Sequence, residues 1–221
     1  MADQPRPVPQ GPADWAERTE QLVLDAALRI SPERGWNRAM TLQAAADCAL
    51  GPGDAGLLLP HGPRDLAALL SRRHDAAALV GLAEVDAGAL KIRERIFRAV
   101  QARLEAAAHD EAAVRRWAGF MAMPTNLPLA LSLVWDTADQ LWRWAGDMAT
   151  DENHYSKRMI LAGILVPALA LRVTRGRTVA EDYVAARIEN VMAFEKWKAG
   201  RTRPTDTLRE IAAALGRMRY R

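Results

Sequence analysis

Residues 135–158, WDTADQLWRWAGDMATDENHYSKR, gather three tryptophans, four aspartates and a tyrosine within a chain otherwise rich in alanine, leucine and arginine. Trp135, Asp139 and Trp142 are separated by four and three residues, so they share one face of a helix. Gly146 stands where a helix C-terminus favours a residue that adopts positive φ, and Asp151 is a suitable N-cap for a following helix. The stretch therefore predicts two helices joined by a short turn, with its polar and aromatic side chains gathered at the join.

The segment after this join, MILAGILVPALALRV at 159–173, is the most apolar part of the chain. It belongs to a predicted helix over 156–173 that contains Pro167. A helix that is apolar on all sides has to be buried in a core, in an oligomer interface or around a ligand. Apolar spacing and helix start and stop signals predict further helices at 14–31, 41–50, 55–59, 64–82, 91–108, 111–123, 129–145, 180–199 and 208–220. Strand-forming runs are scarce, so the sequence predicts an all-α fold.

Length and composition favour a globular protein with a substantial core, because 221 residues suffice for one domain or for two small subdomains. The single cysteine, Cys48, excludes an internal disulfide and indicates a reducing compartment. The first ten residues contain three prolines and lack the apolar run of a signal peptide. No apolar run approaches the roughly 20 residues of a membrane span. We therefore expect a soluble or peripheral protein.

A long helix, a short helix, a glycine-containing turn and another short helix occupy 14–63, which is the outline of a helix-turn-helix. The arrangement resembles the N-terminal domain of TetR-type repressors, with Thr41 as the expected N-cap of the first short helix. Between Thr41 and Pro63, however, there is no Lys or Arg, and Asp47 and Asp54 add negative charge. Contacts to phosphates supply most non-specific affinity for DNA. We therefore expect a three-helix scaffold for which DNA is an unlikely partner.

The sequence contains no constellation of residues typical of an enzyme. It has no Glu-x-x-His pair, no clustered Cys and His, no P-loop and no nucleophile elbow. Asp151 and His154 are three residues apart and form a candidate acid–base or metal-ligating pair, but no second pair completes a coordination sphere. His74 and His109 belong to no motif and are expected at the surface. The prediction is a non-enzymatic protein without a metal or cofactor.

The C-terminal segment combines a hinge composition at 201–207, RTRPTDT, with a predicted amphipathic helix at 208–220. Each apolar side chain buried in a membrane surface contributes about 1.5–3 kcal/mol, and each arginine near an anionic leaflet about 1 kcal/mol more. Reversible attachment to a membrane surface is therefore expected. The alternative is that the same face docks on the core of the chain or on a partner. The predicted membrane contacts are Leu208, Arg209, Ile211, Leu215, Arg217 and Met218.

Five motifs make the chain similar to a known family. They are LPHGPRDL at 59–66, KIRER at 91–95, MPTNLPLAL at 123–131, ADQLWRWAGDMATDENHYSKR at 138–158 and RIENVMAFEK at 187–196. In this order and at this spacing they resemble the bacterial form of the ubiquinone-biosynthesis family called coenzyme Q protein nine. The chain departs from the family pattern at Glu152, where a large apolar residue is usual, at His154, where an aromatic residue is usual, and at Pro167.

The resemblance implies an all-α, TetR-like fold that forms a homodimer and encloses a cavity for an isoprenoid lipid. It also implies a C-terminal amphipathic helix that meets the membrane, and a surface patch that docks a hydroxylase acting on a quinone intermediate. The implied docking patch consists of Asp139, Trp142, Asp147, Asp151, Asn153, His154, Tyr155 and Arg158. The predicted lipid contacts, on the helices 129–145, 156–173 and 180–199, are Leu131, Val134, Ile160, Leu161, Ile164, Leu165 and Met192.

These expectations combine into one hypothesis about organisation and function. A disordered N-terminus at 1–13 precedes a degenerate helix-turn-helix-like subdomain at 14–63, and 64–200 forms the lipid-binding and dimerisation region. The hinge at 201–207 then leads into the membrane-associating helix at 208–221. The protein is expected in the bacterial cytoplasm, peripherally associated with the inner membrane, with a bound isoprenoid or phospholipid that it presents to a ubiquinone-biosynthesis hydroxylase. The alternative hypothesis is a TetR-like transcriptional regulator with a small-molecule pocket.

Overall fold

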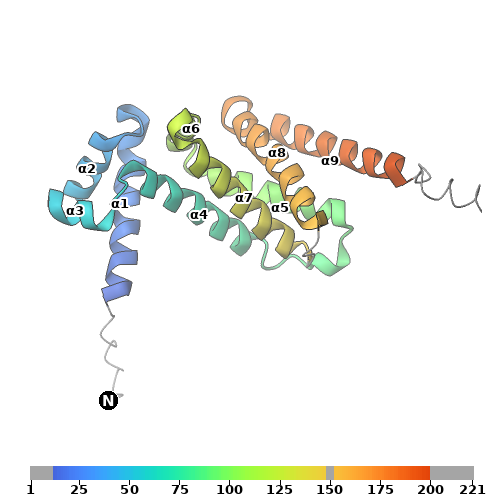
Figure 1. The fold of residues 1–221 in the computed structure, drawn as a ribbon, viewed down its shortest axis with the longest axis horizontal. Coiled ribbons are helices and arrows are strands. Elements are labelled where there is room, and N and C mark those ends of the chain that lie inside the picture. The colour runs from blue at the N-terminus through green and yellow to red at the C-terminus, as the bar shows by residue number, and fades with distance from the viewer. Residues whose placement is uncertain (1–11, 148–151, 200–221) are drawn as a thin grey trace, which may run out of the picture.

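The computed structural model describes residues 12–147 and 152–199, and in these residues it contains α-helices and two short 3₁₀ turns but no β-strand. Figure 1 shows the helices in order along the chain. They are α1 (Pro12–Arg34), α2 (Arg38–Asp47), α3 (Pro52–Leu58), α4 (Pro63–Gly81), α5 (Ile92–Ala108), α6 (Glu111–Met121), α7 (Leu127–Trp144), α8 (Glu152–Arg175) and α9 (Arg177–Ala199), with 3₁₀ turns at Ala87–Ala89 and Pro124–Asn126. The all-α prediction is confirmed.

The helices α1, α2 and α3 form a small unit at one end of the molecule (Figure 1). Asn37 caps α2, because its side-chain oxygen accepts a hydrogen bond from the Met40 amide at 2.9 Å. Thr41 was predicted as this cap and the prediction is wrong: Thr41 lies inside α2, and its hydroxyl donates to the Asn37 carbonyl at 3.2 Å. The Trp36 indole N–H donates to the Pro63 carbonyl at 2.9 Å and ties this unit to the start of α4. A three-helix unit followed by longer helices agrees with the TetR-like prediction.

Two clusters of buried apolar side chains hold the longer helices together. The first joins α1, α2 and the first half of α4 to residues of α5, α6 and α7. The second lies between α5, α7, α8 and α9. Burial of such side chains supplies most of the favourable free energy of folding. The second cluster therefore fixes the arrangement of the helices that carry the predicted docking patch and the predicted lipid contacts.

A buried polar layer lies between the two clusters. Asp75 of α4 accepts a 2.6 Å hydrogen bond from Arg103 Nε of α5 and bonds of 2.9 and 3.0 Å from the Thr137 hydroxyl of α7. Burial raises the pKa of the Asp75 carboxyl, although Arg103 and Thr137 act in the opposite direction. Because these three residues come from three helices, the layer fixes how α4, α5 and α7 are aligned.

His74 is buried next to this layer, so its predicted surface position is wrong. Its Nε2 lies 2.9 Å from Asp110 Oδ2, and only 4% of the residue is exposed. Burial and the nearby Arg103 lower the pKa of the His74 imidazole to about 4, against the opposing effect of Asp110. His109 is exposed, as predicted.

The apolar helix α8 buries one face and leaves the other exposed in this single chain. Leu161, Ile164 and Leu165 belong to the second cluster, whereas Met159 and Val166 are exposed. Full burial of the apolar segment, as predicted, is therefore not achieved by this chain alone.

None of the helices in the described part of the chain is both long and apolar enough to cross a membrane by itself. The segments Glu111–Met121 and Pro124–Trp144 reach the required length and apolar character only when they are taken together, and the angle between them is 93°.

Candidate functional site

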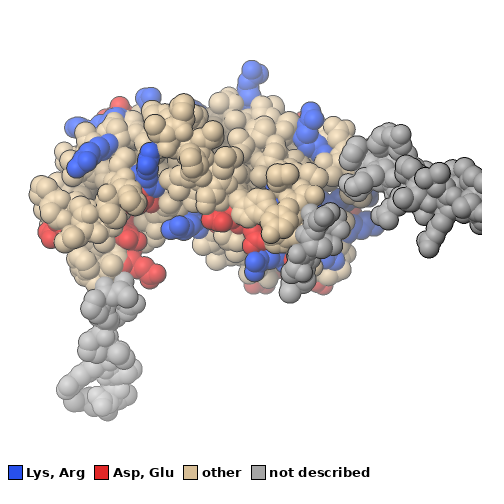
Figure 2. Space-filling view, viewed as in Figure 1, with Lys and Arg blue, Asp and Glu red and all other residues tan. Residues whose placement is uncertain are grey.

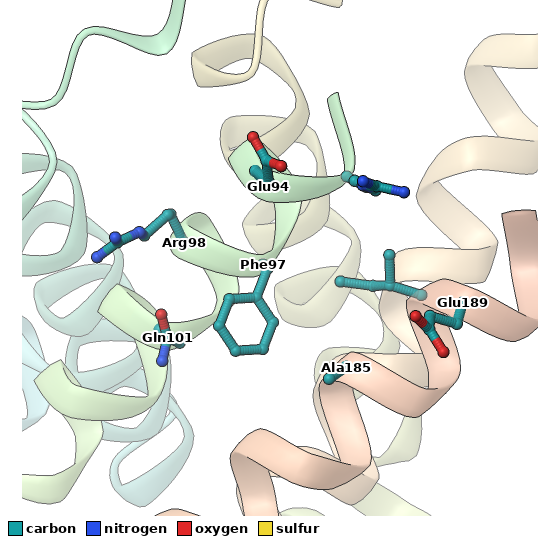
Figure 3. A pocket seen from close by; sticks show the side chains of 8 residues that line it. Glu94, Phe97, Arg98, Gln101, Ala185 and Glu189 are labelled. Atoms are coloured by element: carbon teal, nitrogen blue, oxygen red, sulfur yellow. The ribbon is translucent and has the colours of Figure 1, made fainter. Parts of the chain in front are cut away.

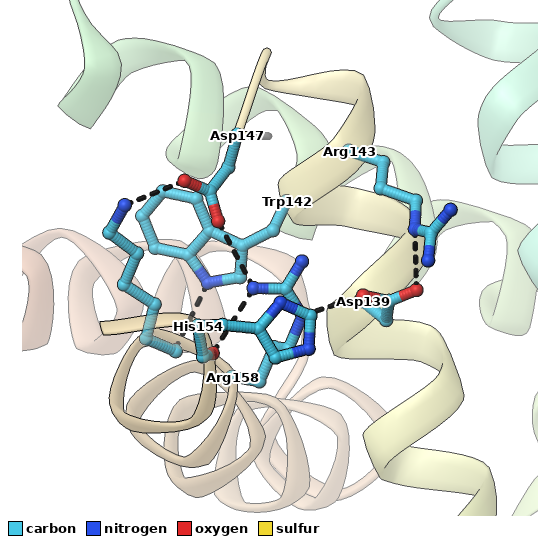
Figure 4. A network of polar contacts seen from close by, with 7 residues as sticks. Asp139, Trp142, Arg143, Asp147, His154 and Arg158 are labelled. Atoms are coloured by element: carbon cyan, nitrogen blue, oxygen red, sulfur yellow. Dashed lines mark hydrogen bonds and ion pairs between the residues drawn. The ribbon is translucent and has the colours of Figure 1, made fainter. Parts of the chain in front are cut away.

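A buried ionic network joins α7 to the start of α8 (Figure 4). Arg158 lies at its centre, with 1% of its side chain exposed. Its Nε donates to Asp139 Oδ1 at 2.6 Å, and its Nη1 donates to Asp147 Oδ2 at 3.0 Å and to the His154 carbonyl at 3.1 Å. A buried charge requires such partners because its desolvation is costly. The predicted patch residues Asp139, Asp147 and Arg158 are therefore brought together by direct contacts.

Two further cations surround this centre. Lys157 Nζ lies 2.6 Å from Asp147 Oδ1, and Arg143 Nε lies 2.7 Å from Asp139 Oδ2. Burial alone would raise the pKa of both aspartates, but hydrogen bonds from Arg158, Arg143 and Lys157 outweigh it and lower the pKa values below their usual range. Both carboxyl groups are therefore ionised and accept hydrogen bonds. This suits them to holding the neighbouring cations in place rather than to donating a proton.

Trp142 connects the ionic network with the apolar interior. Its indole N–H donates to the Lys157 carbonyl at 3.0 Å, and the Lys157 ammonium lies 5.5 Å from the centre of its ring. The side chain is partly buried and packs against the second apolar cluster. The predicted common face of Trp135, Asp139 and Trp142 is confirmed, since all three side chains meet residues of α8.

The aromatic part of the patch lies nearer to solvent. The ring centres of Trp135 and Tyr155 are 6.0 Å apart, and those of His154 and Tyr155 are 5.1 Å apart. Tyr155 is 61% exposed. Rings at such distances attract one another beyond their burial. The patch therefore has a buried ionic base and an exposed aromatic edge.

Exposed apolar side chains continue from this aromatic edge along α7 and α8. They are Leu127, Leu131, Met159, Ile160 and Val166. Figure 2 shows that the surface over these two helices carries few charged side chains. Contiguous apolar surface next to a polar rim is typical of an interaction site.

A small apolar cavity lies on the inner side of α8, between α5, α7 and α9. Its volume is about 70 Å³, and it contains four of the predicted lipid contacts, Ile160, Leu161, Ile164 and Met192. We call this cavity the slot. The other lining residues are Ile92, Arg93, Ile96, Trp142, Ile188 and Val191.

The remaining predicted lipid contacts lie outside the slot. Leu131 is 59% exposed on α7, Val134 is partly buried against the second cluster, and Leu165 is buried within that cluster. Their contact with lipid stays a prediction.

Some predicted site residues lie outside the described part of the chain. Asp151 and the whole membrane-contacting set from Leu208 to Met218 are among them, and Asn153 is placed only by its backbone. The proposed metal or acid–base pair of Asp151 and His154 is therefore not described. Among the described residues, no group of three or more His, Cys, Asp or Glu side chains is arranged to hold a metal ion.

Arg95 positions the join between α7 and α8, a role that no pattern in the sequence indicated. Its Nη1 donates to the Ala145 carbonyl and its Nε to the Leu90 carbonyl, both at 2.9 Å. Gly146 follows with φ of +91°, as predicted, and the Asp147 amide bonds back to the Trp142 carbonyl at 3.0 Å. The motif KIRER at 91–95 contains Arg95 and was the one feature of the sequence that pointed to this residue. The contact itself joins residues 50 positions apart, and such a contact produces no periodic pattern from which it could be predicted.

The fold and the site together define an all-α protein in which the predicted docking patch lies beside an apolar slot. The family model described as COQ9 matches residues 127–195, which carry the predicted docking patch and the α7, α8 and α9 sides of the slot. The chain is 30% identical over 162 residues to the ubiquinone biosynthesis protein COQ9-B, mitochondrial, of Xenopus laevis, an alignment that covers 67% of this chain and 53% of the relative. It is 29% identical over 156 residues to the corresponding COQ9 protein of Rattus norvegicus, covering 67% and 49%.

A similar match, 28% identity over 156 residues, is found to COQ9 of Homo sapiens, covering 67% of this chain and 48% of the relative. The chain belongs to the COQ9 family. It spans about half the length of the curated relatives that it matches.

Proposed function

We propose that this protein is a non-enzymatic accessory protein of ubiquinone biosynthesis that binds an isoprenoid quinone precursor and presents it to a modifying hydroxylase. The relatives are named as ubiquinone biosynthesis proteins, which supports the pathway. The observation that carries the proposal is the position of Trp142. One side chain lines the apolar slot and also donates to the Lys157 carbonyl within the interaction patch. Lipid and partner would therefore meet at one tryptophan.

The slot as it stands holds only a small part of a lipid chain. Its volume of about 70 Å³ is about twice the roughly 30 Å³ that one water molecule occupies in the liquid. A longer isoprenoid chain would therefore have to separate α8 from α9 or extend beyond this single chain. Helices that move apart by small rigid shifts are a common way to open such a site.

The patch is suited to docking a protein because it combines exposed aromatic surface with ordered charges. Trp, Tyr and Arg dominate the energetics of protein interfaces. Here Tyr155 is exposed beside Trp135, and the exposed Arg143 is held by Asp139. The apolar face of α7 and α8 adjoins this patch. This apolar face would be buried by a hydroxylase, by a second copy of the chain in a homodimer, or by both.

Recovery of lipid from the purified protein tests the proposal. Protein made in a bacterial host is extracted and its lipids are analysed by mass spectrometry. We expect an isoprenoid or phospholipid from the native chain and a reduced amount from Ile164→Phe, which fills the slot. Val166→Phe is the matched control, since Val166 is exposed two residues further along α8. No lipid from the native chain, or equal amounts from both variants, would contradict the proposal.

Peripheral attachment to the bacterial inner membrane is the second part of the proposal, and it relies on the composition of residues 208–221. Four apolar side chains at helical spacing accompany several arginines there. Such a helix binds an anionic surface reversibly. Deletion of residues 205–221 is expected to abolish flotation with anionic liposomes while leaving the melting temperature unchanged. Unchanged flotation would refute this part of the proposal.

The residues of α3 argue against the alternative of a transcriptional regulator. In α3, which occupies the position of a recognition helix, the charged residue is Asp54, and Leu57 is 85% exposed. Neither side chain suits a contact with phosphate.

A further inference from the structure

An open groove of about 460 Å³ lies between α5 and α9. Figure 3 shows Phe97 of α5 pointing into it towards α9, where Ala185 and Glu189 face it. Arg93 and Ile188 line both this groove and the slot, so the two adjoin one another. A different groove, which we call the N-terminal groove, shares no lining residue with the slot.

The N-terminal groove lies between α1, α3, α4 and the start of α7. Its volume is about 620 Å³, within the range of binding sites. The helix α4 lines it from Arg64 to Arg72, which corresponds to about 12 Å along the helix axis. This length suits an extended ligand, such as a helix of a few turns.

Two of the sequence motifs, at 59–66 and 123–131, meet at this groove, although neither lines the slot or joins the ionic network. Arg64 of the first motif donates from Nε to Asn126 Oδ1 at 2.8 Å and from Nη2 to the Thr125 carbonyl at 2.9 Å. These bonds hold one side of the groove in place in the absence of a ligand. Such preorganisation reduces the entropic cost of binding.

Leucine side chains form the apolar part of the N-terminal groove. They come from three helices and are Leu57 and Leu58 of α3, Leu69 of α4 and Leu129 of α7. Leu57 is 85% exposed, and the other three are partly buried. A ligand with apolar side chains would remove this surface from water, which is favourable.

Glu20 of α1 adds an uncompensated negative charge to the groove. Within the described residues its carboxylate makes no hydrogen bond or ion pair. Partial burial raises the pKa of Glu20, and the nearby Asp65 and Glu17 raise it further, against the opposing effect of Arg72. The surroundings therefore disfavour the negative charge of Glu20, and a cation supplied by a ligand would stabilise it.

We propose that the N-terminal groove docks an amphipathic helix of a partner protein, with leucine-like side chains on one face and a lysine or arginine at the edge of that face. The apolar side chains pack on Leu57 and Leu69, and the cation pairs with Glu20. Helices occupy apolar grooves through side chains at such spacing. This site is separate from the predicted docking patch and does not depend on the proposed lipid-binding function.

Two synthetic helical peptides test the proposal on the full chain. Both carry leucine on one face and alanine elsewhere, and the edge of the leucine face carries lysines in one peptide and glutamates in the other. Binding of the labelled peptides is followed by fluorescence anisotropy. We expect the lysine peptide to bind at least about tenfold more tightly than the glutamate peptide, because only the lysine peptide can pair with Glu20.

Leu57→Ser and Glu20→Gln are the test variants, and each has a control that does not line the groove. The control for Leu57→Ser is Val80→Ser, since Val80 is 75% exposed on α4, and the control for Glu20→Gln is Glu33→Gln, an exposed residue of α1. We expect each test variant to weaken binding of the lysine peptide about tenfold. Both controls should bind it as the native chain does.

Each contrary result overturns the proposal in a different way. Equal weakening by Glu20→Gln and Glu33→Gln would show a non-specific attraction between charges, and equal affinity for the two peptides would remove the role of the cation. Failure of the native chain to bind either peptide would refute the docking site. If Leu57→Ser instead changed the mass of the protein in light scattering, the groove would be a contact between copies of this chain.

Discussion

Arg158 of α8 donates from Nε to Asp139 Oδ1 of α7 at 2.6 Å, although only 1% of its side chain is exposed. The same guanidinium also bonds to Asp147 at 3.0 Å. A cation on α8 that bonds both to Asp139 of α7 and to Asp147 of the join fixes the angle between the helices. Removal of one member of a buried ion pair is strongly destabilising because the remaining charges lose their partner.

Replacement of Arg158 by Met is therefore expected to lower the free energy of unfolding by about 3 kcal/mol, as measured by urea denaturation. Arg143→Met is the matched control, because Arg143 also bonds to Asp139 but its side chain is 69% exposed. Exposed pairs contribute little, so the control is expected to lose about 0.5 kcal/mol. If the two variants lost equal free energy of unfolding, the burial of Arg158 would not be the reason that it stabilises the fold.

Tyr155 and Trp142 are expected to respond differently to truncation, although both belong to the predicted patch. Tyr155→Ala should weaken capture of the hydroxylase without changing the melting temperature, since Tyr155 is 61% exposed. Trp142→Ala should lower the melting temperature as well, because Trp142 packs against the core and bonds to the Lys157 carbonyl. Tyr155→Phe, which keeps the ring, should retain most of the binding. A fall in melting temperature for Tyr155→Ala would place that residue in the core instead.

His74 makes the stability of the fold dependent on pH. Its pKa is lowered from 6.5 to about 4 in the folded protein, so between these values only the unfolded chain binds the proton. The stabilisation is fully present above about pH 6.5 and is lost as pH falls towards 4, by up to about 3 kcal/mol in total. Urea denaturation at several pH values should show this slope in the native chain. In His74→Gln the slope between pH 6.5 and 4 should largely disappear, and a persistent slope would assign it to other groups.

Gly146 is expected to be a sensitive position at the join of α7 and α8. Its φ is +91°, and a Cβ added there would lie 3.2 Å from Arg95 Nη1. Gly146→Ala should therefore cost about 1–2 kcal/mol of stability from the backbone alone and should disturb the bond from Arg95 to Ala145. Gly163→Ala is the control, since Gly163 is helical and a Cβ there meets no atom within 4 Å. A harmless Gly146→Ala would contradict the role given to this turn.

The positions of the helices were predictable because they depend on local signals. Apolar spacing placed α4, α5 and α7 within a few residues of their observed ends, and Pro128 lies in the first turn of α7 as its missing N–H allows. The same reasoning located Gly146. Thr41 was chosen wrongly as a cap because Asn37, four residues earlier, satisfies the same free amides.

The contacts between distant residues were not predictable in this way. His74 looks like a surface residue in the sequence, but Asp110, 36 residues away, provides the partner that accompanies its burial. Arg158 was predicted within a surface patch and lies beneath that surface, because Asp139 and Asp147 offset its desolvation. The groove beside Phe97 depends on how α5 and α9 pack, and no local pattern reports this packing.

Hydroxylation of a prenylated phenol in liposomes by the partner hydroxylase tests the central claim most directly. The rate of product formation is measured with and without a stoichiometric amount of this protein. The account predicts that the native chain accelerates the reaction, and that Tyr155→Ala, which still binds lipid, does not. An unchanged rate with the native chain, or equal acceleration by Tyr155→Ala, would contradict the claim that the protein presents its lipid to the enzyme through this patch.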